Sequence, residues 1–177
     1  MDGSTSAYTP ALAALIEASD LVSADVRAWW NWRHKEEAPV AEAFERIYAR
    51  LPEFRSLMHY RFRSLGLDLK ALPRMAVAND LYIICDDIGP GFRIQHGYST
   101  WIAAESIGRD FFINQNVTIG LKGGKKPVIG NNVRVCTGAV VFGGITVGDN
   151  VVIAPNAVVD FDVPAGKKVF PARSVIV

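Results

Sequence analysis

Aliphatic residues recur at every sixth position in the C-terminal part of the chain. The six clearest positions are Ile129, Val135, Val141, Val147, Ile153 and Val159. Each is followed four positions later by a second aliphatic or small residue, at Val133, Ala139, Ile145, Val151, Ala157 and Val163. A period of six matches neither the helical repeat of about 3.6 residues nor the twofold alternation of a single hairpin. The pattern therefore predicts a solenoid in which short strands stack coil upon coil, with three hexads in each coil.

The same step continues upstream, but it is interrupted twice. Further positions of the repeat are Ile88, Ile94, Ile107, Ile113 and Ile119. Ile94 and Ile107 are thirteen positions apart where two hexads need twelve, so we expect one extra residue within 100–106. Ile119 and Ile129 are ten positions apart, so four residues leave the solenoid in the segment LKGGKKP. This loop contains two glycines and three lysines, which makes it a candidate for a basic arm over a site.

The coil count also predicts a column of side chains along one edge. If Ile94, Ile113, Val135 and Ile153 begin successive coils, the residues two positions later stack on one another: His96, Gln115, Thr137 and Pro155. His96 is the only histidine of the repeat, and its position turns away from the interior. An imidazole with an ordinary pKa near 6.5 is well suited to take a proton from a hydroxyl. A lone histidine is nevertheless more often a surface or packed residue, so His96 is a candidate only.

The chain upstream of the repeat has the signals of helices. Four helix starts are indicated by Thr9 with Pro10, by Ser23, by Pro39 and by Pro52. They predict helices near residues 11–20, 24–32, 39–51 and 52–65, the last closed by Gly66. We therefore expect a helical segment over residues 1–75 and a solenoid domain over residues 76–177. The helical segment holds an unusual cluster, Trp29, Trp30 and Trp32 beside four basic residues. Core packing with a contact to another subunit is one interpretation, and stacking on a ligand is the other.

Composition limits the classes of function. The chain has 177 residues, half of them apolar, and a net charge of +1, which is not typical of nucleic-acid or membrane-surface binding. No apolar run approaches the roughly 18 residues of a membrane span, and the first twenty residues do not have the pattern of a signal peptide. Two cysteines, Cys85 and Cys136, do not make a disulfide framework, so we expect a reduced, cytoplasmic setting. Cys136 stands at a hexad turn and is expected to be a packed residue, not a nucleophile.

Several segments together resemble a known family. They are IGPGFRIQHGYSTWI, SIGRDFFINQNVTIG, the run that begins PVIGNNVRVCTGAVV, and VFPAR near the end. Over residues 50–177 they resemble the left-handed β-helix of the serine acetyltransferase family, within the hexapeptide-repeat acyltransferase superfamily. The shorter members found among exopolysaccharide and capsule genes are particularly similar. The resemblance implies a mainly β fold, a left-handed parallel β-helix after an N-terminal helical segment. It also implies a homotrimer or a dimer of trimers that transfers acetyl from acetyl-CoA to a hydroxyl.

The resemblance assigns roles around His96. It implies that His96 is the general base on the acceptor hydroxyl, and that turn amides near Gly120 stabilise the tetrahedral oxyanion. In the family a carboxylate fifteen positions earlier orients the base. That position is Leu81 here, and the adjacent Asp80 is the candidate partner, although an aspartate in a turn at the start of the solenoid is an equally good interpretation.

Departures from the family pattern concern the acceptor. The candidate acceptor-binding residues are Gln95, Gln115, Lys125 and Lys126. Gln95 stands where the family has an aspartate before the base, and Leu51 precedes Pro52 where the family has a second aspartate. Two acids that grip the ammonium group of serine are therefore missing, which favours a neutral sugar hydroxyl or an acceptor bearing a carboxylate. Serine-type and saccharide-type acceptors both remain open.

The resemblance places acetyl-CoA in a groove between subunits along the C-terminal coils. The candidate residues for binding it are Gly120, Gly138, Gly144, Ala154, Lys167, Lys168 and Arg173. No metal is expected, because zinc-bearing relatives of this fold use three histidines and this repeat supplies one. A chain that ends four positions after Arg173 is not expected to dock cysteine synthase. A non-catalytic scaffold is the second hypothesis, and a metal-dependent hydratase is the third.

Overall fold

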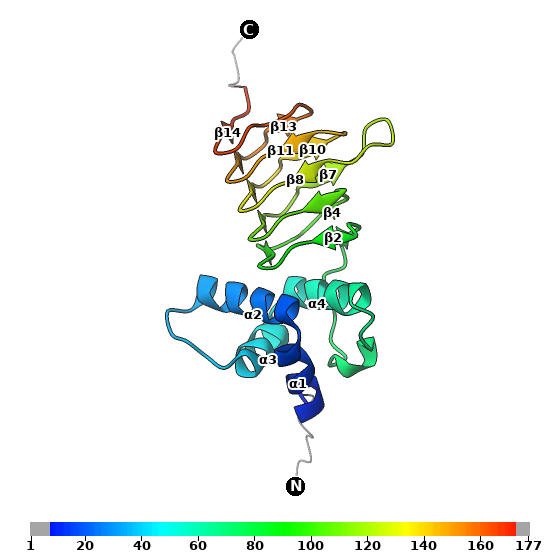
Figure 1. Ribbon diagram of the computed structural model, residues 1–177, viewed down its shortest axis with the longest axis vertical. Coiled ribbons are helices and arrows are strands. Elements are labelled where there is room, and N and C mark those ends of the chain that lie inside the picture. The colour runs from blue at the N-terminus through cyan, green and yellow to red at the C-terminus, as the bar shows by residue number, and fades with distance from the viewer. Residues whose placement is uncertain (1–7, 173–177) are drawn as a thin grey trace. The chain divides into compact units, whose positions relative to one another are not determined.

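The computed structural model describes residues 8–172, which form two compact units (Figure 1). One unit extends up to Ala78 and the other begins at Asn79. The first is helical and the second is built of short strands. Each unit has a core of its own, and the two are described in turn.

The helical unit contains α1 (Pro10–Ala18), α2 (Asp20–Arg33), α3 (Val40–Arg50), α4 (Pro52–Ser64) and a short 3-10 helix, η1 (Leu69–Ala71). Thr9 caps α1 as expected, since its side chain accepts a hydrogen bond from the Leu12 N–H at 3.2 Å. The expected start of the second helix at Ser23 is wrong. Ser19 is the cap, accepting from the Val22 N–H at 3.3 Å, and Ser23 lies buried inside α2, where its hydroxyl donates to the Ile16 carbonyl. The Ser23 hydroxyl bonds to a backbone carbonyl, whereas a capping hydroxyl accepts from a free N–H at the helix start. Sequence alone does not distinguish these two uses of serine.

Aromatic side chains fill the core of the helical unit. The ring of Trp29 lies edge-on to Phe54 at 5.1 Å between centroids, and Phe44 stacks on Tyr48 at 5.2 Å. Such pairs add about 0.5–1.5 kcal/mol each beyond the area that they bury. Trp29 and Trp30 are buried and Trp32 is half-buried, so the tryptophan cluster contributes to this core.

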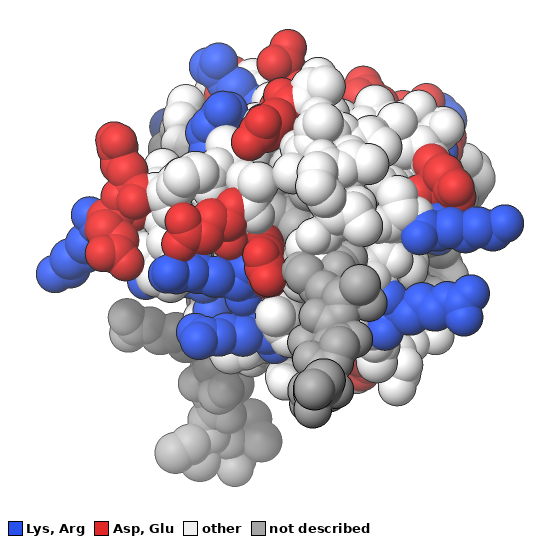
Figure 2. All heavy atoms as spheres, turned by 90° about the horizontal axis from the view of Figure 1, so that it is seen from below, with Lys and Arg blue, Asp and Glu red and all other residues white. Residues whose placement is uncertain are grey.

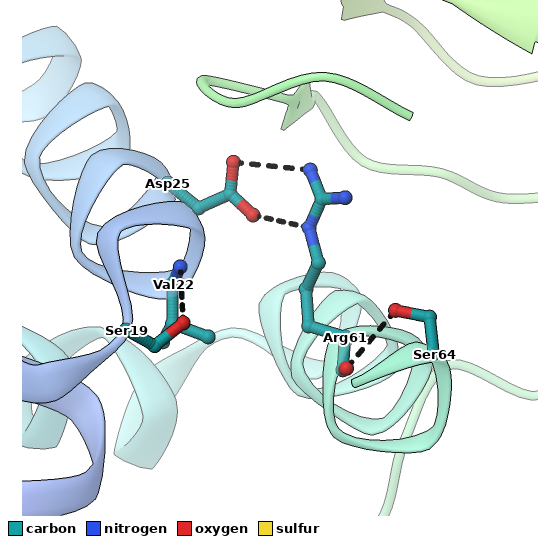
Figure 3. A network of polar contacts seen from close by, with 5 residues as sticks. All are labelled: Ser19, Val22, Asp25, Arg61 and Ser64. Carbon is teal, nitrogen blue, oxygen red and sulfur yellow. Dashed lines mark hydrogen bonds and ion pairs between the residues drawn. The ribbon is translucent and has the colours of Figure 1, made fainter. Parts of the chain in front are cut away.

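A buried ion pair joins two helices of this unit (Figure 3). The Nε–H of Arg61 on α4 donates to Oδ2 of Asp25 on α2 at 2.7 Å, and an Nη2 of Arg61 lies 3.4 Å from Oδ1. Both side chains are almost completely excluded from solvent, at 1% and 0% exposure. Two charges removed from water require this kind of two-point pairing, so the contact specifies how α2 and α4 meet.

The second unit is a parallel solenoid with three sheets. The first sheet contains, in order, β1 (Leu81–Ile83), β4 (Thr100–Ile102), β7 (Thr118–Gly120), β10 (Val140–Phe142) and β13 (Val158–Val159). The second contains β11 (Thr146–Val147), β8 (Val128–Ile129), β5 (Ser106–Ile107) and β2 (Asp87–Ile88). The third contains β14 (Lys168–Val169), β12 (Val152–Ile153), β9 (Arg134–Val135), β6 (Phe112–Ile113) and β3 (Arg93–Ile94). The expected fold class, a parallel β-helix of hexapeptide repeats after an N-terminal helical segment, is confirmed.

The register confirms the predicted coil count. In the third sheet Ile94 pairs with Ile113, Ile113 with Val135, and Val135 with Ile153. The twelve hexad residues first singled out from residue 129 onward are all buried. Parallel strands stacked in this way bury their aliphatic side chains in one narrow interior, which is why the six-residue period is so regular.

The extra residue expected within 100–106 lies elsewhere. Because Ile102 pairs with Ile119, the step from Ile94 to Ile102 is eight positions, and the step from Ile102 to Ile107 is five. The turn between β3 and β4 is therefore two residues longer than a hexad, and the next segment is one residue shorter. The sequence reveals only the sum of the two steps.

Close stacking of the coils demands glycine at one corner. A Cβ on Gly108 would lie 2.7 Å from the carbonyl carbon of Gly130, and one on Gly148 would lie 2.6 Å from the backbone nitrogen of Ala165. Other corners use residues with positive φ, namely Asp110, Asn116, Asn132, Asn150 and Asn156. Asparagine and aspartate tolerate this left-handed conformation better than other residues with a Cβ, so they mark the corners that glycine does not.

Charged side chains are mixed on the face of the chain that Figure 2 shows, where lysines and arginines lie among acidic residues. This distribution agrees with a net charge of +1. A membrane-crossing helix is not found among residues 8–172, since none of their helices combines the necessary length with the necessary hydropathy.

Candidate functional site

The turn between β3 and β4 presents His96 at an edge of the solenoid. His96 is exposed, and its φ of 70° lies in the left-handed region, as does that of Gly97 at 69°. The imidazole ring is parallel to the ring of Tyr98, at 4° between planes and 6.1 Å between centroids. The two residues inserted into this turn thus display an imidazole outside the core, beside an exposed tyrosine. Backbone strain at a residue with a Cβ is often found at functional sites.

Asp80 contacts the same turn, but through Ser99. Its Oδ2 accepts hydrogen bonds from the Ser99 N–H at 2.8 Å and from the Ser99 hydroxyl at 3.2 Å. The Ser99 backbone also has a positive φ, of 47°. The carboxylate therefore holds the end of the turn that begins at His96. A direct bond between the side chains of Asp80 and His96 is not observed in the described part of the chain.

The candidate acceptor residues on either side of His96 are amides. The Oε1 of Gln95 accepts a hydrogen bond from Nδ2 of Asn114 at 2.9 Å, which links two successive coils. Gln115 is half-buried, and its backbone carbonyl accepts from the Gly138 N–H. The equivalent carbonyl one coil earlier is that of Tyr98, which accepts from the Asn116 N–H. The predicted column is therefore wrong at its first member, because the two residues inserted into the turn move His96 out of register with Gln115. The edge next to the imidazole therefore offers neutral donors and acceptors. Asn114 was not expected from sequence, although its place after Ile113 corresponds to that of Gln95 after Ile94.

The extruded loop folds as a small hairpin. Lys122 and Lys125 form an antiparallel bridge, and the two residues between them, Gly123 and Gly124, have φ of 59° and 76°. Two consecutive positive φ values are those of a tight primed turn, which explains the glycine pair. Nζ of Lys122 lies 3.0 Å from Oδ2 of Asp160, a residue of a later coil, so the hairpin is tied back to the solenoid.

Lys125 and Lys126 differ in their surroundings. Lys125 is exposed, and Lys126 is half-buried. A Cβ on Gly144 would lie 2.8 Å from the Cβ of Lys125, so the base of the hairpin packs against the chain at Gly144. Gly120 is in the same place, because its carbonyl accepts from the Gly143 N–H at 3.1 Å. The structure thus brings together Lys125, a candidate for binding the acceptor, and two candidates for binding acetyl-CoA, Gly120 and Gly144.

The other candidate residues for binding acetyl-CoA lie on the last two coils. Gly138 has a positive φ of 71°, and a Cβ at this position would collide with Oδ1 of Asn156, whose side chain would have to move. Ala154 is buried, and its N–H donates to the carbonyl of Val169 in the neighbouring strand β14. Lys167 and Lys168 are exposed at this level. Arg173 lies outside the described residues.

The cysteines have the character of packed residues. Cys85 is buried and its thiol donates to the Asp87 carbonyl, while Cys136 is half-buried. Burial raises the pKa of both thiols, which disfavours the thiolate that a nucleophile needs. Among the described residues, no cluster of three or more histidine, cysteine, aspartate or glutamate side chains could hold a metal ion.

Sequence relatives of the chain carry one recurring name. The chain is 42% identical over 92 residues to a serine acetyltransferase of Helicobacter pylori strain J99, a match that covers 49% of this chain and 54% of the relative. It is 38% identical over 96 residues to the serine acetyltransferase of Bacillus subtilis strain 168, covering 50% of this chain and 44% of that one. The chain thus spans about half the length of the curated relatives that it matches. No family model matches the chain.

Solved structures of the same name share the fold. A crystal structure of Neisseria gonorrhoeae serine acetyltransferase in complex with serine matches with a TM-score of 0.67 at 24% identity, over 92% of this chain and 70% of that one. Serine acetyltransferase isoform 3 of Entamoeba histolytica, in complex with cysteine, matches with a TM-score of 0.64 at 23% identity, over 88% and 59%. At these identities the likeness is one of fold.

The six-residue repeat, the stacked parallel coils and the edge histidine define a hexapeptide-repeat β-helix protein. Within this class, the sequence matches at around 40% identity are to serine acetyltransferases. Over about half of its length, the chain is thus similar to proteins named serine acetyltransferase.

Proposed function

We propose that the chain is an acetyl-CoA-dependent O-acetyltransferase of the serine acetyltransferase type, with His96 as general base. The observation that carries this proposal is the exposed imidazole on the lengthened turn of a solenoid whose relatives are named serine acetyltransferase. A base of this kind must be reachable by a substrate, and His96 is the one exposed histidine among the described residues.

The proposed reaction needs no covalent enzyme intermediate. His96 takes the proton of the acceptor hydroxyl while that oxygen attacks the carbonyl carbon of the thioester, so a C–O bond forms. Backbone amides near Gly120 stabilise the resulting oxyanion, a contribution of about 3 kcal/mol per donor in other enzymes. The C–S bond then breaks, and the protonated imidazole returns the proton to the departing CoA thiolate. Asp80 serves as a positioning residue, because it holds the His96 turn through Ser99.

We assign the binding of the two substrates to residues around His96 and on the last coils. Lys125 and Lys126 supply positive charge over the acceptor, and Gln95 and Gln115 supply amides. The pantetheine of acetyl-CoA passes the small residues Gly138, Gly144 and Ala154, and its phosphates meet the cationic side chains of Lys167, Lys168 and Arg173. This groove is completed by a second subunit, in a homotrimer or a dimer of trimers. We expect the protein to work in the cytoplasm.

A saccharide or nucleotide sugar is the alternative acceptor. The observation that favours it is the pairing of Gln95 with Asn114, which fills the edge beside His96 with neutral amides. Amides hydrogen-bond well to sugar hydroxyls, whereas the ammonium group of free serine is left without an anionic partner.

A thiol-release assay tests both the activity and the acceptor. The purified chain is incubated with acetyl-CoA and, separately, with serine, homoserine, amino sugars and nucleotide sugars. Acceptor-dependent release of CoA supports the proposal, and the acceptor with the highest kcat/KM decides between the two classes. A chain that neither binds acetyl-CoA in calorimetry nor releases CoA with any of these acceptors would be a scaffold.

A further inference from the structure

A basic cavity in the helical unit is not used by the proposed reaction. It has a volume of about 570 Å³ and is lined by Arg33, His34, Arg46, Ile47, Arg50 and Leu51. Three of these six side chains carry a guanidinium group. Among the described residues, no carboxylate lines the cavity. The volume is that of a typical small-molecule site, about 300–1,000 Å³.

The arginines of this cavity are incompletely neutralised. Glu42 pairs with Arg46 at 2.8 Å on the exposed surface of α3, and Glu53 lies at the long distance of 3.9 Å from Arg33. Arg50 forms no ion pair with any residue in the range 8–172. Arg33 lies in the last turn of α2 and Arg50 in the last turn of α3, where the carbonyl groups of the helix end favour a cation.

Aromatic rings hold two of the three guanidinium groups in place. Arg33 lies over the ring of Trp32, with its Cζ 4.5 Å from the centroid, and Arg46 lies over Trp30 at 5.7 Å. The ring of His34 stacks on Trp30 at 3.7 Å between centroids, and its Nδ1 lies 3.3 Å from the Trp30 carbonyl oxygen. Cation–π contacts reduce the freedom that an arginine loses when it binds an anion. Trp30 and Trp32 thus contact side chains that line the cavity.

From these contacts we propose that the cavity binds a small multivalent anion that carries phosphate or carboxylate groups. Guanidinium forks bind both groups through pairs of hydrogen bonds, so both classes share the same recognition chemistry. Arg46 and Arg50, on one face of α3, grip the anion directly, and Arg33 approaches from α2. The site lies in the helical unit, away from His96 in sequence, and its existence is independent of the reaction proposed above.

Calorimetric titration of the full chain at low salt tests this site, with pyrophosphate and citrate as separate probes. We expect saturable binding of at least one probe, and the identity of that probe separates a phosphate ligand from a carboxylate ligand. The variant Arg46→Gln/Arg50→Gln should bind it at least about tenfold more weakly, because charge-assisted hydrogen bonds are lost. Arg63→Gln, an exposed arginine of α4 that does not line the cavity, should bind like the wild type.

Two results would overturn the proposal. One is the absence of saturable binding of both probes. The other is binding that persists in the Arg46→Gln/Arg50→Gln variant and disappears in Lys167→Gln/Lys168→Gln, which would move the site to the solenoid. If the cavity variant does not fold, the side-chain Nε–H signals of the wild type provide the test by NMR. Those of Arg46 and Arg50 should shift on addition of the probe and that of Arg63 should not, and the reverse pattern contradicts the site.

Discussion

The carboxylate of Asp80 accepts two hydrogen bonds from Ser99, one from its N–H at 2.8 Å and one from its hydroxyl at 3.2 Å. This contact connects the start of the first coil to the far end of the turn that carries His96. Three positions separate Ser99 from His96, and both residues have positive φ. A carboxylate that is not bonded to the imidazole thus contacts the turn that carries it.

Removal of this carboxylate should impair turnover more than stability. In Asp80→Ala we expect kcat for CoA release to fall about tenfold or more, because a small misplacement of a catalytic group is costly. Calorimetric affinity for acetyl-CoA should stay close to that of the wild type. The matched control is Asp162→Ala, which removes a similar bond, from the Thr146 N–H to a carboxylate oxygen at 2.7 Å, at another corner. Equal kcat values for the two variants would show that Asp80 has only a structural role.

The lysines of the hairpin should discriminate between acceptors by charge. Lys125→Ala/Lys126→Ala should raise KM about tenfold for an acceptor that bears a carboxylate, since two cations near its binding site are lost. For a neutral sugar the KM should be unchanged. Lys70→Ala, in the helical unit, is the control for a change in net charge. If KM rises for charged and neutral acceptors alike, the hairpin contributes shape and not charge.

The buried pair of Asp25 and Arg61 should be the most sensitive polar contact in the helical unit (Figure 3). Asp25→Ala leaves a guanidinium without this partner in the core, and we expect the free energy of unfolding to fall by about 3–5 kcal/mol. Glu42→Ala breaks an exposed pair with Arg46 and should cost less than about 1 kcal/mol. Urea unfolding followed by tryptophan fluorescence measures both. If the free energy of unfolding falls by similar amounts in the two variants, the buried pair contributes no more to stability than the exposed one.

The helical unit should lose stability as the pH falls below about 6.5. Burial, reinforced by the nearby charge of Arg63, lowers the pKa of His59 in the folded chain. Between its ordinary pKa near 6.5 and this lower value, the unfolded chain binds more protons than the folded chain, so acid favours unfolding. His59 contributes its full effect above pH 6.5 and loses it as the pH falls through the folded pKa. Between pH 7.5 and 5.5 the melting temperature of the wild type should fall more than that of His59→Gln. An equal fall in both proteins would contradict the assignment of this effect to His59.

The regular parts of the fold could be predicted because their physical cause is periodic. Each aliphatic position of the six-residue repeat lines a shared interior, and the register of the third sheet follows from counting back from Ile153 to Ile94. The helix starts were predicted correctly where a capping side chain precedes the helix, as at Thr9, or where proline stands in its first turn, as at Pro10 and Pro52. At Ser23 the prediction was wrong, because a hydroxyl inside a helix and one at its end have the same sequence signal.

The site was predictable only where the column follows from the register. The coil count places Gln115 and Thr137 correctly, but it puts His96 where the structure has Tyr98. The reason is that the two-residue lengthening of the His96 turn cancels in part against a shortened segment near Ile107. The contact between Asp80 and Ser99 depends on that turn, so it could not be derived from spacing. The bond from Lys122 to Asp160 joins residues thirty-eight positions apart, on a hairpin whose direction the sequence does not reveal.

The role of His96 as general base is tested most directly by the turnover of His96→Asn with acetyl-CoA and the best acceptor of the screen. Asparagine tolerates the positive φ of this position better than alanine, so the turn should remain intact. We predict that acetyl-CoA still binds with the affinity of the wild type, and that acceptor-dependent CoA release falls by a factor of about 100 or more. Unchanged CoA release in this variant would contradict the assignment of the base.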